Sequence, residues 1–280
     1  MNAPVARMRL QATRGLRWLD LRELWEYREL AGFLAWRDIK VRYKHTVLGI
    51  AWVLLQPLAM MLVFWLFFGR LAGLGKDMAV PYPLFALAGL PAWQFFARVA
   101  QESGGSLLAN QRLLSKVYFP RILAPVASAG AAFLDFAVCL GLLAVGLTVG
   151  GYMPGWQVLA LPAFALLMVA TALGVGCWLA ALSTEFRDVV HVTPFLVQFW
   201  MIATPVVYPA SLIPERFRWL AGLNPMTGVV EGFRWALLGA GEGPGLTVGL
   251  SVGVAALLLL SGVAWFRWRE RRFADLLGGQ

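Results

Sequence analysis

Charged residues are almost absent from five long stretches of this 280-residue chain. The stretches are 45–69, 78–97, 122–184, 189–214 and 243–266. A helix rises about 1.5 Å per residue, so about 20 apolar residues cross a hydrocarbon core of about 30 Å. The stretch 122–184 is long enough for two crossings, and Gly and Pro near its middle indicate a turn. The pattern therefore predicts an all-α integral membrane protein with six transmembrane helices.

Charge placement divides the chain into three parts: an N-terminal segment of residues 1–45, a transmembrane domain of 46–266 and a tail of 267–280. We expect the spans at about 48–69, 84–101, 122–149, 157–183, 189–208 and 246–266. Prolines within the first, second and fifth spans predict kinks or breaks. The stretch 209–241 is too apolar for an open loop, and its pieces are too short to span. Two short re-entrant or interfacial helices are therefore predicted between spans five and six.

Composition supports this prediction and also settles what the net charge means. The chain is 60% hydrophobic and 14% charged, whereas about a quarter of the residues in a soluble domain are charged. Nineteen of the 24 Lys and Arg residues fall in alternate segments between the spans, namely the N-terminal segment, 98–121, the 184–188 loop and the tail. The positive-inside rule then places both termini in the cytoplasm. The net charge of +9 therefore predicts contact with anionic lipid and no nucleic-acid partner.

The N-terminal segment predicts an amphipathic interface helix over about 17–33. Trp18, Leu21 and Trp25 lie at helical spacing with charged residues between them, which is typical of a helix in the headgroup layer. A basic run follows over 37–44, and its four cations are Arg37, Lys40, Arg42 and Lys44. They either anchor the cytoplasmic end of span one or bind an anionic lipid headgroup or pyrophosphate, and the pattern leaves both interpretations open.

The segment 103–121 begins with polar residues and is stopped by Pro120, which predicts a short cytoplasmic helix. Leu113, Leu114, Val117 and Phe119 give this helix an apolar edge. An apolar patch facing the cytosol is a liability unless something covers it. The edge is therefore either a docking surface for a soluble partner or a surface packed on the bilayer.

Groups that catalyse reactions or bind metals are sparse. The Gly75-Lys76 step is not a phosphate-binding loop. Such a loop has a glycine five residues before the Gly-Lys pair and a Ser or Thr after it, whereas this chain has Arg70 and Asp77 at these positions. His45 and His191 are too few and too far apart for a metal site, and Cys139 and Cys177 are expected to be packed free thiols. We therefore predict no catalytic residue, no metal and no cofactor in this chain. Asp135 stands alone inside a span, where either a structural hydrogen bond or a functional role explains it.

Several short segments occur in an order that resembles a known family. They are 36–44, Leu48–Gly49, 52–57, 116–121, 186–189, Pro205, 208–209, 224–226 and 231–234. Together they resemble the membrane subunit of bacterial type-2 ABC exporters for polysaccharides, the O-antigen, capsule and teichoic-acid permeases. The resemblance covers about residues 20–240. The segments 42–44 and 117–121 look closest to the O-antigen and teichoic-acid group.

The resemblance implies a transporter permease subunit without enzymatic activity in the bacterial inner membrane. A second copy of the chain would complete the channel, and two separate ATPase subunits would bind ATP and Mg²⁺. The implied cargo is a polysaccharide linked to undecaprenyl pyrophosphate, which is moved from cytoplasm to periplasm. Spans one and five of the two copies would line its path.

The resemblance also implies roles for individual residues. Aromatic side chains of spans one and five would stack on sugar rings along the path: Phe64, Trp65, Phe67, Phe195, Phe199, Trp200 and Tyr208. Residues of a coupling helix at about 104–120 and of the 184–188 loop would dock on the ATPase: Asn110, Leu113, Leu114, Val117, Phe119 and Arg187. Two outer gate helices, at about 212–222 and 226–238, would contain Pro214, Trp219, Asn224, Pro225 and Arg234. The four cations of the basic run would meet the pyrophosphate.

Three other interpretations stay open at this point. A type-2 ABC permease for a drug or lipid shares the six-span plan. An intramembrane enzyme acting on polyprenyl-linked sugars needs convergent carboxylates or histidines, and Glu185, Asp188 and His191 are the only such group close together in a loop. An ion-coupled transporter is disfavoured because Asp135 has no second carboxylate within a span and no inverted repeat is evident.

Overall fold

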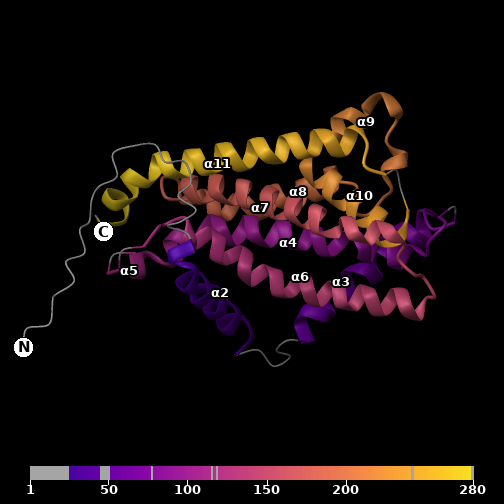
Figure 1. The fold of residues 1–280 in the computed structure, drawn as a ribbon, viewed down its shortest axis with the longest axis horizontal. Helices are drawn as coiled ribbons and strands as arrows, with labels where there is room; N and C mark the ends of the chain where they lie inside the picture. Colours follow the sequence, from indigo (N-terminus) through magenta and orange to yellow (C-terminus); the bar gives the residue numbers. More distant parts are fainter. Residues whose placement is uncertain are drawn as a thin grey trace, which may run out of the picture.

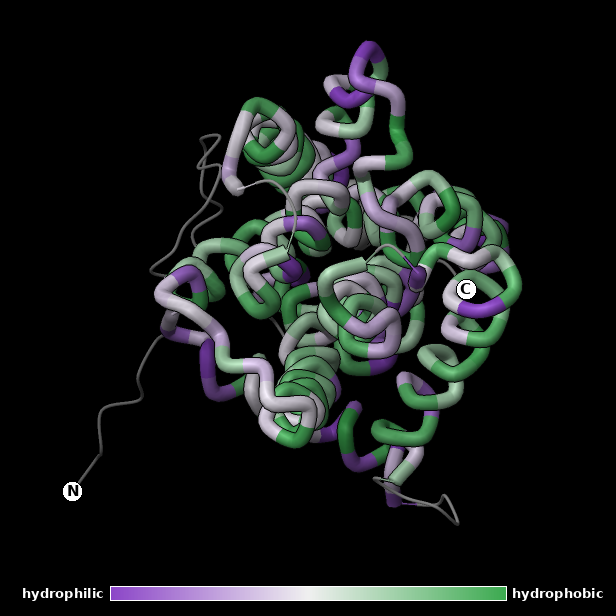
Figure 2. The backbone as a smooth tube through the Cα atoms, turned by 90° about the vertical axis from the view of Figure 1, so that its right-hand side faces the viewer, coloured by the Kyte–Doolittle hydropathy of each residue, from purple (hydrophilic) through white to green (hydrophobic). Residues whose placement is uncertain are grey.

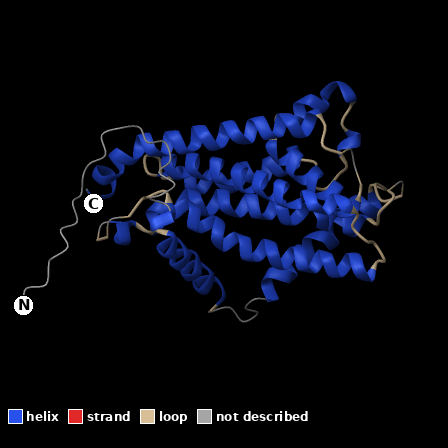
Figure 3. Ribbon diagram, viewed as in Figure 1, coloured by secondary structure: helices blue, strands red, loops and turns tan. Residues whose placement is uncertain are grey.

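The computed structural model describes residues 25–44, 51–76, 78–114, 116–117, 119–240 and 243–278, with side chains described as far as Glu270. All regular secondary structure in these ranges is helical (Figure 3). This agrees with the predicted all-α class. The part of the predicted interface helix before residue 25 lies outside the described ranges, and the rest is described and runs into the helix Arg28–Tyr43.

The helices follow one another without intervening strands in the described ranges. They are α2 (Arg28–Tyr43), α3 (Ala51–Phe64) with a π-helical continuation (Trp65–Leu71), α4 (Tyr82–Ala109), α5 (Gln111–Leu114), α6 (Leu123–Val149), α7 (Leu161–Ser183), α8 (Asp188–Ala203), α9 (Glu215–Gly222), α10 (Pro225–Leu238) and α11 (Leu246–Gly278). Short 3₁₀ turns at Trp156–Ala160 and Ala210–Leu212 precede α7 and α9.

The long helices run side by side in an elongated bundle (Figure 1). Helix α4 lies at its centre and packs against α6, α7, α8 and α10, while α11 packs along α7. Helix α5 and the C-terminal end of α11 lie at one end of the bundle, and α9 lies at the other. Hydrophobic residues cover the outside of the bundle as well as its interior (Figure 2), as expected for helices that face lipid.

Four helical segments in the described ranges are long and apolar enough to cross a membrane: Ala51–Leu71, Leu123–Val149, Trp156–Ser183 and Leu246–Glu270. Their positions match predicted spans one, three, four and six to within a few residues. Helix α4 has 28 residues but carries Arg98 and Glu102. Helix α8 is apolar, but it has only 16 residues, fewer than the roughly 20 that a straight crossing needs.

Span five was predicted to continue to residue 208, but its helix ends earlier. Helix α8 ends at Ala203, and Thr204 has extended backbone angles, φ −100° and ψ 136°. Pro205 explains this end, because proline disfavours helical geometry in the residue before it and has no N–H to donate. By contrast, Pro91 lies inside an unbroken α4, so the predicted break in span two is also wrong.

The segment 103–121 differs from the predicted short cytoplasmic helix. Residues 103–109 continue α4, and α5 adds a single turn, Gln111–Leu114. The Asn110 side chain donates to the Ser106 carbonyl at 2.8 Å, where α4 ends. Phe119 is 3% exposed in a cluster with Leu34 of α2 and residues of α6. Phe119 is therefore not part of an exposed apolar edge, because α2 covers it.

Two glycines let α7 and α11 approach closely. A Cβ at Gly174 would lie 2.6 Å from the backbone nitrogen of Leu259, and a Cβ at Gly262 would lie 2.3 Å from the carbonyl oxygen of Gly174. Small residues at such crossings are typical of helix packing in membranes, where close van der Waals contact stabilises the pair.

The two short helices predicted between spans five and six are present as α9 and α10. The Asn224 side chain caps α10 by accepting from the Met226 N–H at 3.1 Å, and Pro225 occupies the first helical position. Both residue types favour a helix start. Helix α10 is buried along most of its length, whereas α9 is largely exposed.

Candidate functional site

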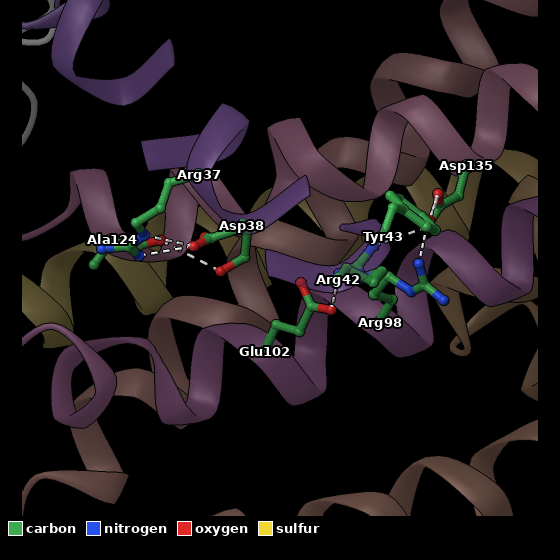
Figure 4. A network of polar contacts seen from close by, with 9 residues as sticks. Arg37, Asp38, Arg42, Tyr43, Arg98, Glu102, Ala124 and Asp135 are labelled. Carbon is green, nitrogen blue, oxygen red and sulfur yellow. Dashed lines mark hydrogen bonds and ion pairs between the residues drawn. The ribbon is translucent and has the colours of Figure 1, made fainter. Parts of the chain in front are cut away.

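A network of charged side chains joins α2, α4 and α6 (Figure 4). Arg42 of α2 donates to Asp135 of α6 at 2.9 Å and forms an ion pair with Glu102 of α4. Arg98 of α4 forms an ion pair with the same Asp135 oxygen, and the Tyr43 hydroxyl donates to the other oxygen of that carboxylate. Asp135 thus accepts hydrogen bonds from two side chains of α2 and is paired with the Arg98 guanidinium of α4.

The network balances two arginines against two carboxylates within a half-buried region, where the side chains are 14% to 34% exposed. A charged group at this depth needs a partner, because burying an unpaired charge is costly. Asp135 is therefore explained by structural pairing, the first of the two interpretations left open by the sequence. Its partners were missed because Arg98 and Glu102 belong to a segment counted as cytoplasmic, although their i, i+4 spacing places them on one face of a helix.

The four cations of the basic run divide into two kinds. Arg37 forms an ion pair with Asp38 at 2.7 Å and donates to Asn110 at 2.7 Å, and Arg42 belongs to the network above. Lys40 and Lys44 are exposed, and Lys40 lies 5.4 Å from the centre of the Trp36 ring. Of these four cations, only Lys40 on α2 and Lys44 directly after it are exposed, so they are the stronger candidates for meeting an anionic headgroup.

The seven aromatic residues predicted to line a path also divide. Phe67, Phe195 and Phe199 are exposed by 55%, 69% and 72% on the continuation of α3 and on α8. Phe64 is 8% exposed and belongs to the main hydrophobic core. The others are partly buried against that core: Trp65, Trp200 and Tyr208. The three exposed phenylalanines form the part of this set that a second molecule can reach.

Trp200 connects the end of α8 to the start of α10. Its indole N–H donates to Asn224 Oδ1 at 2.9 Å, and Asn224 Nδ2 donates to the Thr204 hydroxyl at 2.8 Å. The Trp200 ring also packs edge-on against Phe96, with ring centres 4.9 Å apart. Trp200 and Asn224, predicted in separate roles, therefore share one hydrogen-bonded unit.

Arg234 holds the chain that follows α8. It is 1% exposed, and its Nη1 donates to the Pro205 carbonyl at 2.6 Å and to Glu231 at 2.8 Å. Its Nη2 donates to the Val206 carbonyl, and its guanidinium stacks 3.6 Å from the centre of the Phe85 ring. The planar fork of arginine suits this set of carbonyl acceptors, so Arg234 fixes the irregular segment 204–208 against α4 and α10.

The other predicted gate residues lie on or beside α9 and α10. Pro214 is exposed and precedes α9, and Trp219 is 51% exposed on it. Asn224 and the buried Pro225 begin α10, as described above. The predicted gate residues therefore share one end of the bundle.

At the opposite end, the predicted docking residues are only partly on the surface. Val117 is 49% exposed and Arg187 is exposed, whereas Leu113 and Leu114 are partly buried against the Leu34 and Phe119 cluster. Asn110 is buried, and Phe119 is covered as described above. Phe186, which was not singled out as a docking residue, is 57% exposed in the loop beside Arg187. The sequence signal for Phe186 was an aromatic residue within an otherwise polar loop.

The structure gives no support to a catalytic or metal centre in the described ranges. Glu185 forms an ion pair with Arg269, and Asp188 and His191 are exposed. No group of three or more His, Cys, Asp or Glu side chains there is arranged to hold a metal ion. Cys139 and Cys177 are buried free thiols, as predicted.

Comparison with known proteins identifies the family. A family model described as ABC-2 type transporter matches residues 29–238, which include every helix from α3 to α10. The chain belongs to the ABC-2 type transporter family. As an ABC-2 permease subunit it is a membrane component of a transporter and not an enzyme, which confirms the resemblance drawn from the short motifs.

Individual relatives are similar over most of their length. The chain is 32% identical over 217 residues to the O-antigen export system permease protein RfbA of Myxococcus xanthus, covering 76% of this chain and 82% of that protein. It is 29% identical over 244 residues to the RfbA protein of Klebsiella pneumoniae, covering 86% and 92%. It is 25% identical over 236 residues to the polysialic acid transport protein KpsM of Escherichia coli, covering 84% and 91%.

Proposed function

We propose that this ABC-2 permease subunit exports a polysaccharide of the O-antigen type, linked to undecaprenyl pyrophosphate, from cytoplasm to periplasm. The observation that carries the proposal is the similarity to proteins named for O-antigen export, which extends over 82% and 92% of their length. The exposed aromatic residues Phe67, Phe195 and Phe199 support it, since flat rings stack on sugar rings without strong dependence on sugar sequence.

The proposed assembly has two copies of this chain and two ATPase subunits in the inner membrane. Helices α4 and α8 complete six spans with the four apolar helical segments, so both termini lie on one side, which the positive-inside rule assigns to the cytoplasm. Helix α5 and the 184–188 loop then lie on the cytoplasmic side, and the gate helices α9 and α10 lie on the periplasmic side. In this proposal, exposed Lys40 of α2 and Lys44 directly after it contact the lipid pyrophosphate as it approaches from the inner leaflet.

Surface glycan provides the decisive test of the cargo. Deletion of the gene from its host is expected to leave lipid-linked polysaccharide inside the cell and none at the surface, measured by immunoblot of whole and lysed cells. Complementation with the wild-type gene restores the surface signal. Normal surface glycan in the deletion strain contradicts the proposal.

Co-purification tests the docking surface separately. Phe186→Asp or Val117→Asp is expected to weaken co-purification with the ATPase encoded beside this gene, because each places a charge on an exposed apolar side chain at the cytoplasmic end. Phe217→Asp is the matched control, since Phe217 is 44% exposed on α9 at the opposite end. Equal ATPase recovery with all three variants contradicts the placement of the docking surface.

A further inference from the structure

A cavity of about 840 Å³ lies beneath α9, beside α10 and the start of α11. Six of the residues that line it are Phe85, Arg218, Trp219, Thr227, Glu231 and Arg234. The volume falls within the range of about 300–1,000 Å³ that is typical of small-molecule sites. None of the seven aromatic residues predicted to line the export path lines this cavity. It is therefore a space within one subunit, separate from that set.

Two polar groups on one face of α10 border the cavity with unused hydrogen-bonding capacity. The Thr227 hydroxyl is fully buried and has no hydrogen-bond partner among the described residues. A buried hydroxyl without a partner destabilises the fold, which makes it a signal that something else satisfies it. Glu231, four residues later, lies on the same face. One of its oxygens accepts from Arg234, and an ionised carboxylate has room for further donors.

The charges around the cavity favour a neutral ligand over an anion. The lining contains the carboxylates of Glu215 and Glu231 and the guanidinium groups of Arg218 and Arg234, so its formal charges cancel. Arg234 already donates to backbone carbonyls and to Glu231. A pyrophosphate would need uncompensated cations, which this lining does not provide.

We propose that this cavity binds one pyranose unit of a glycan. The ring face stacks on Trp219, which is 51% exposed and lines the cavity, while ring hydroxyls bond to Thr227 and donate to Glu231. This combination of an aromatic face, a carboxylate acceptor and a hydroxyl suits a neutral polyhydroxylated ring. The inference rests on the proposed polysaccharide cargo and adds a sugar subsite under the gate helices of each subunit.

The test measures sugar binding directly. The permease–ATPase complex is placed in lipid nanodiscs, so that no sugar-headed detergent competes, and saturation-transfer difference NMR is recorded with glucose, galactose, mannose and N-acetylglucosamine. At least one sugar is expected to give a signal. Thr227→Val should weaken its binding about fivefold and Glu231→Gln about tenfold, in line with the loss of a neutral and a charge-assisted hydrogen bond. Arg216→Gln, an exposed position on α9 that does not line the cavity, should leave binding unchanged.

Thermal unfolding of the same variants separates a binding defect from a folding defect. Thr227→Val keeps the side-chain shape and removes a buried hydroxyl without a partner, so its Tm is expected to rise while sugar binding falls. A lower Tm for this variant overturns the proposal, because the hydroxyl would then be satisfied within the protein. A sugar signal that survives both α10 substitutions overturns it too. If no sugar binds while the wild-type complex still exports glycan in cells, the subsite is refuted and the proposed cargo stands.

Discussion

At the scale of single residues, the ionisable groups of the bundle are held by pairing. Arg42 and Arg98 face Glu102 and Asp135, and the Tyr43 hydroxyl completes the shell around Asp135. Removing one of these four charged side chains leaves its partner uncompensated. The resulting loss of folding stability is larger than the stability that the ion pair contributes.

Arg42→Met tests this balance. We expect it to lower the free energy of unfolding by about 2 kcal/mol, less than the full cost of a completely buried pair because these side chains are partly exposed. Chemical unfolding in nanodiscs measures the change. Arg42→Met combined with Glu102→Gln should recover part of the loss, whereas Lys40→Met, on an exposed side chain of the same helix, should have little effect on stability. Equal losses for Arg42→Met and Lys40→Met would contradict the network.

Arg234→Lys tests the arginine that holds the segment 204–208. Lysine keeps the charge but lacks the planar fork that donates to the Pro205 and Val206 carbonyls and to Glu231. We expect a loss of about 3 kcal/mol of stability, because buried carbonyls are left without donors. Arg216→Lys on exposed α9 is the control and should be neutral. Unchanged thermal unfolding of Arg234→Lys would refute the role assigned to the guanidinium.

At the scale of elements, helix packing depends on where side chains are missing. The α7–α11 contact is set by Gly174 and Gly262, since a methyl group at either position meets the opposing backbone. Gly174→Ala is expected to cost about 1–3 kcal/mol, because a packed contact must open. Gly253 lies on α11 with open space around it. Gly253→Ala should therefore stabilise the helix by roughly 0.5–1 kcal/mol. Thermal unfolding measures both variants, and we expect a lower Tm for Gly174→Ala and a higher Tm for Gly253→Ala.

The sequence was a good guide to long apolar helices and a poor guide to their ends and partners. The predicted spans 122–149 and 157–183 differ by one residue from the helical segments Leu123–Val149 and Trp156–Ser183. Hydrophobic length alone determines such segments. The end of α8 at Ala203 was missed, although Pro205 carries the local signal for it.

Tertiary contacts are the part of the fold that the sequence did not reveal. Phe119 was assigned to an exposed edge because nothing in a single sequence reveals that Leu34, 85 residues earlier, covers it. In the same way, a single sequence does not reveal that Trp200 bonds to Asn224, and its place on a sugar path stays a prediction. Their aromatic character marked Phe119 and Trp200 as candidate functional residues. Only the packed fold shows which residues they contact.

At the scale of the whole molecule, exposed apolar side chains remain open on two elements, α3 with its continuation and α8. On α3 and its continuation they are Leu62, Leu66 and Phe67, and on α8 they are Phe195, Leu196, Phe199 and Ile202. Lipid, a second subunit and a sliding glycan all fit an apolar face, and aromatic character separates the last of these from the others.

Phe195→Leu combined with Phe199→Leu tests which of these uses dominates. Leucine keeps apolar packing but removes the flat ring, so we expect normal assembly with the ATPase and export slowed several-fold, by loss of stacking at two positions. A pulse-labelled glycan followed to the cell surface measures the rate. Phe133→Leu, an exposed phenylalanine on α6, is the matched control. Wild-type export by the double variant would assign the face to packing or lipid contact.

The unbroken course of α4 has a mechanical consequence for the whole transporter. At about 1.5 Å per residue, its 28 residues form a rod about 42 Å long. Near its start, Phe85 stacks against Arg234, its second half carries Arg98 and Glu102, and its end at Ala109 is followed almost directly by α5. Its interior has two weak places: Pro91, which lacks one backbone donor, and the run 103–106, which contains Gly104 and Gly105 between two serines. A displacement of α4 near α5 would therefore reach α9 and α10 along one continuous helix, with any bending concentrated at Pro91 and at 103–106.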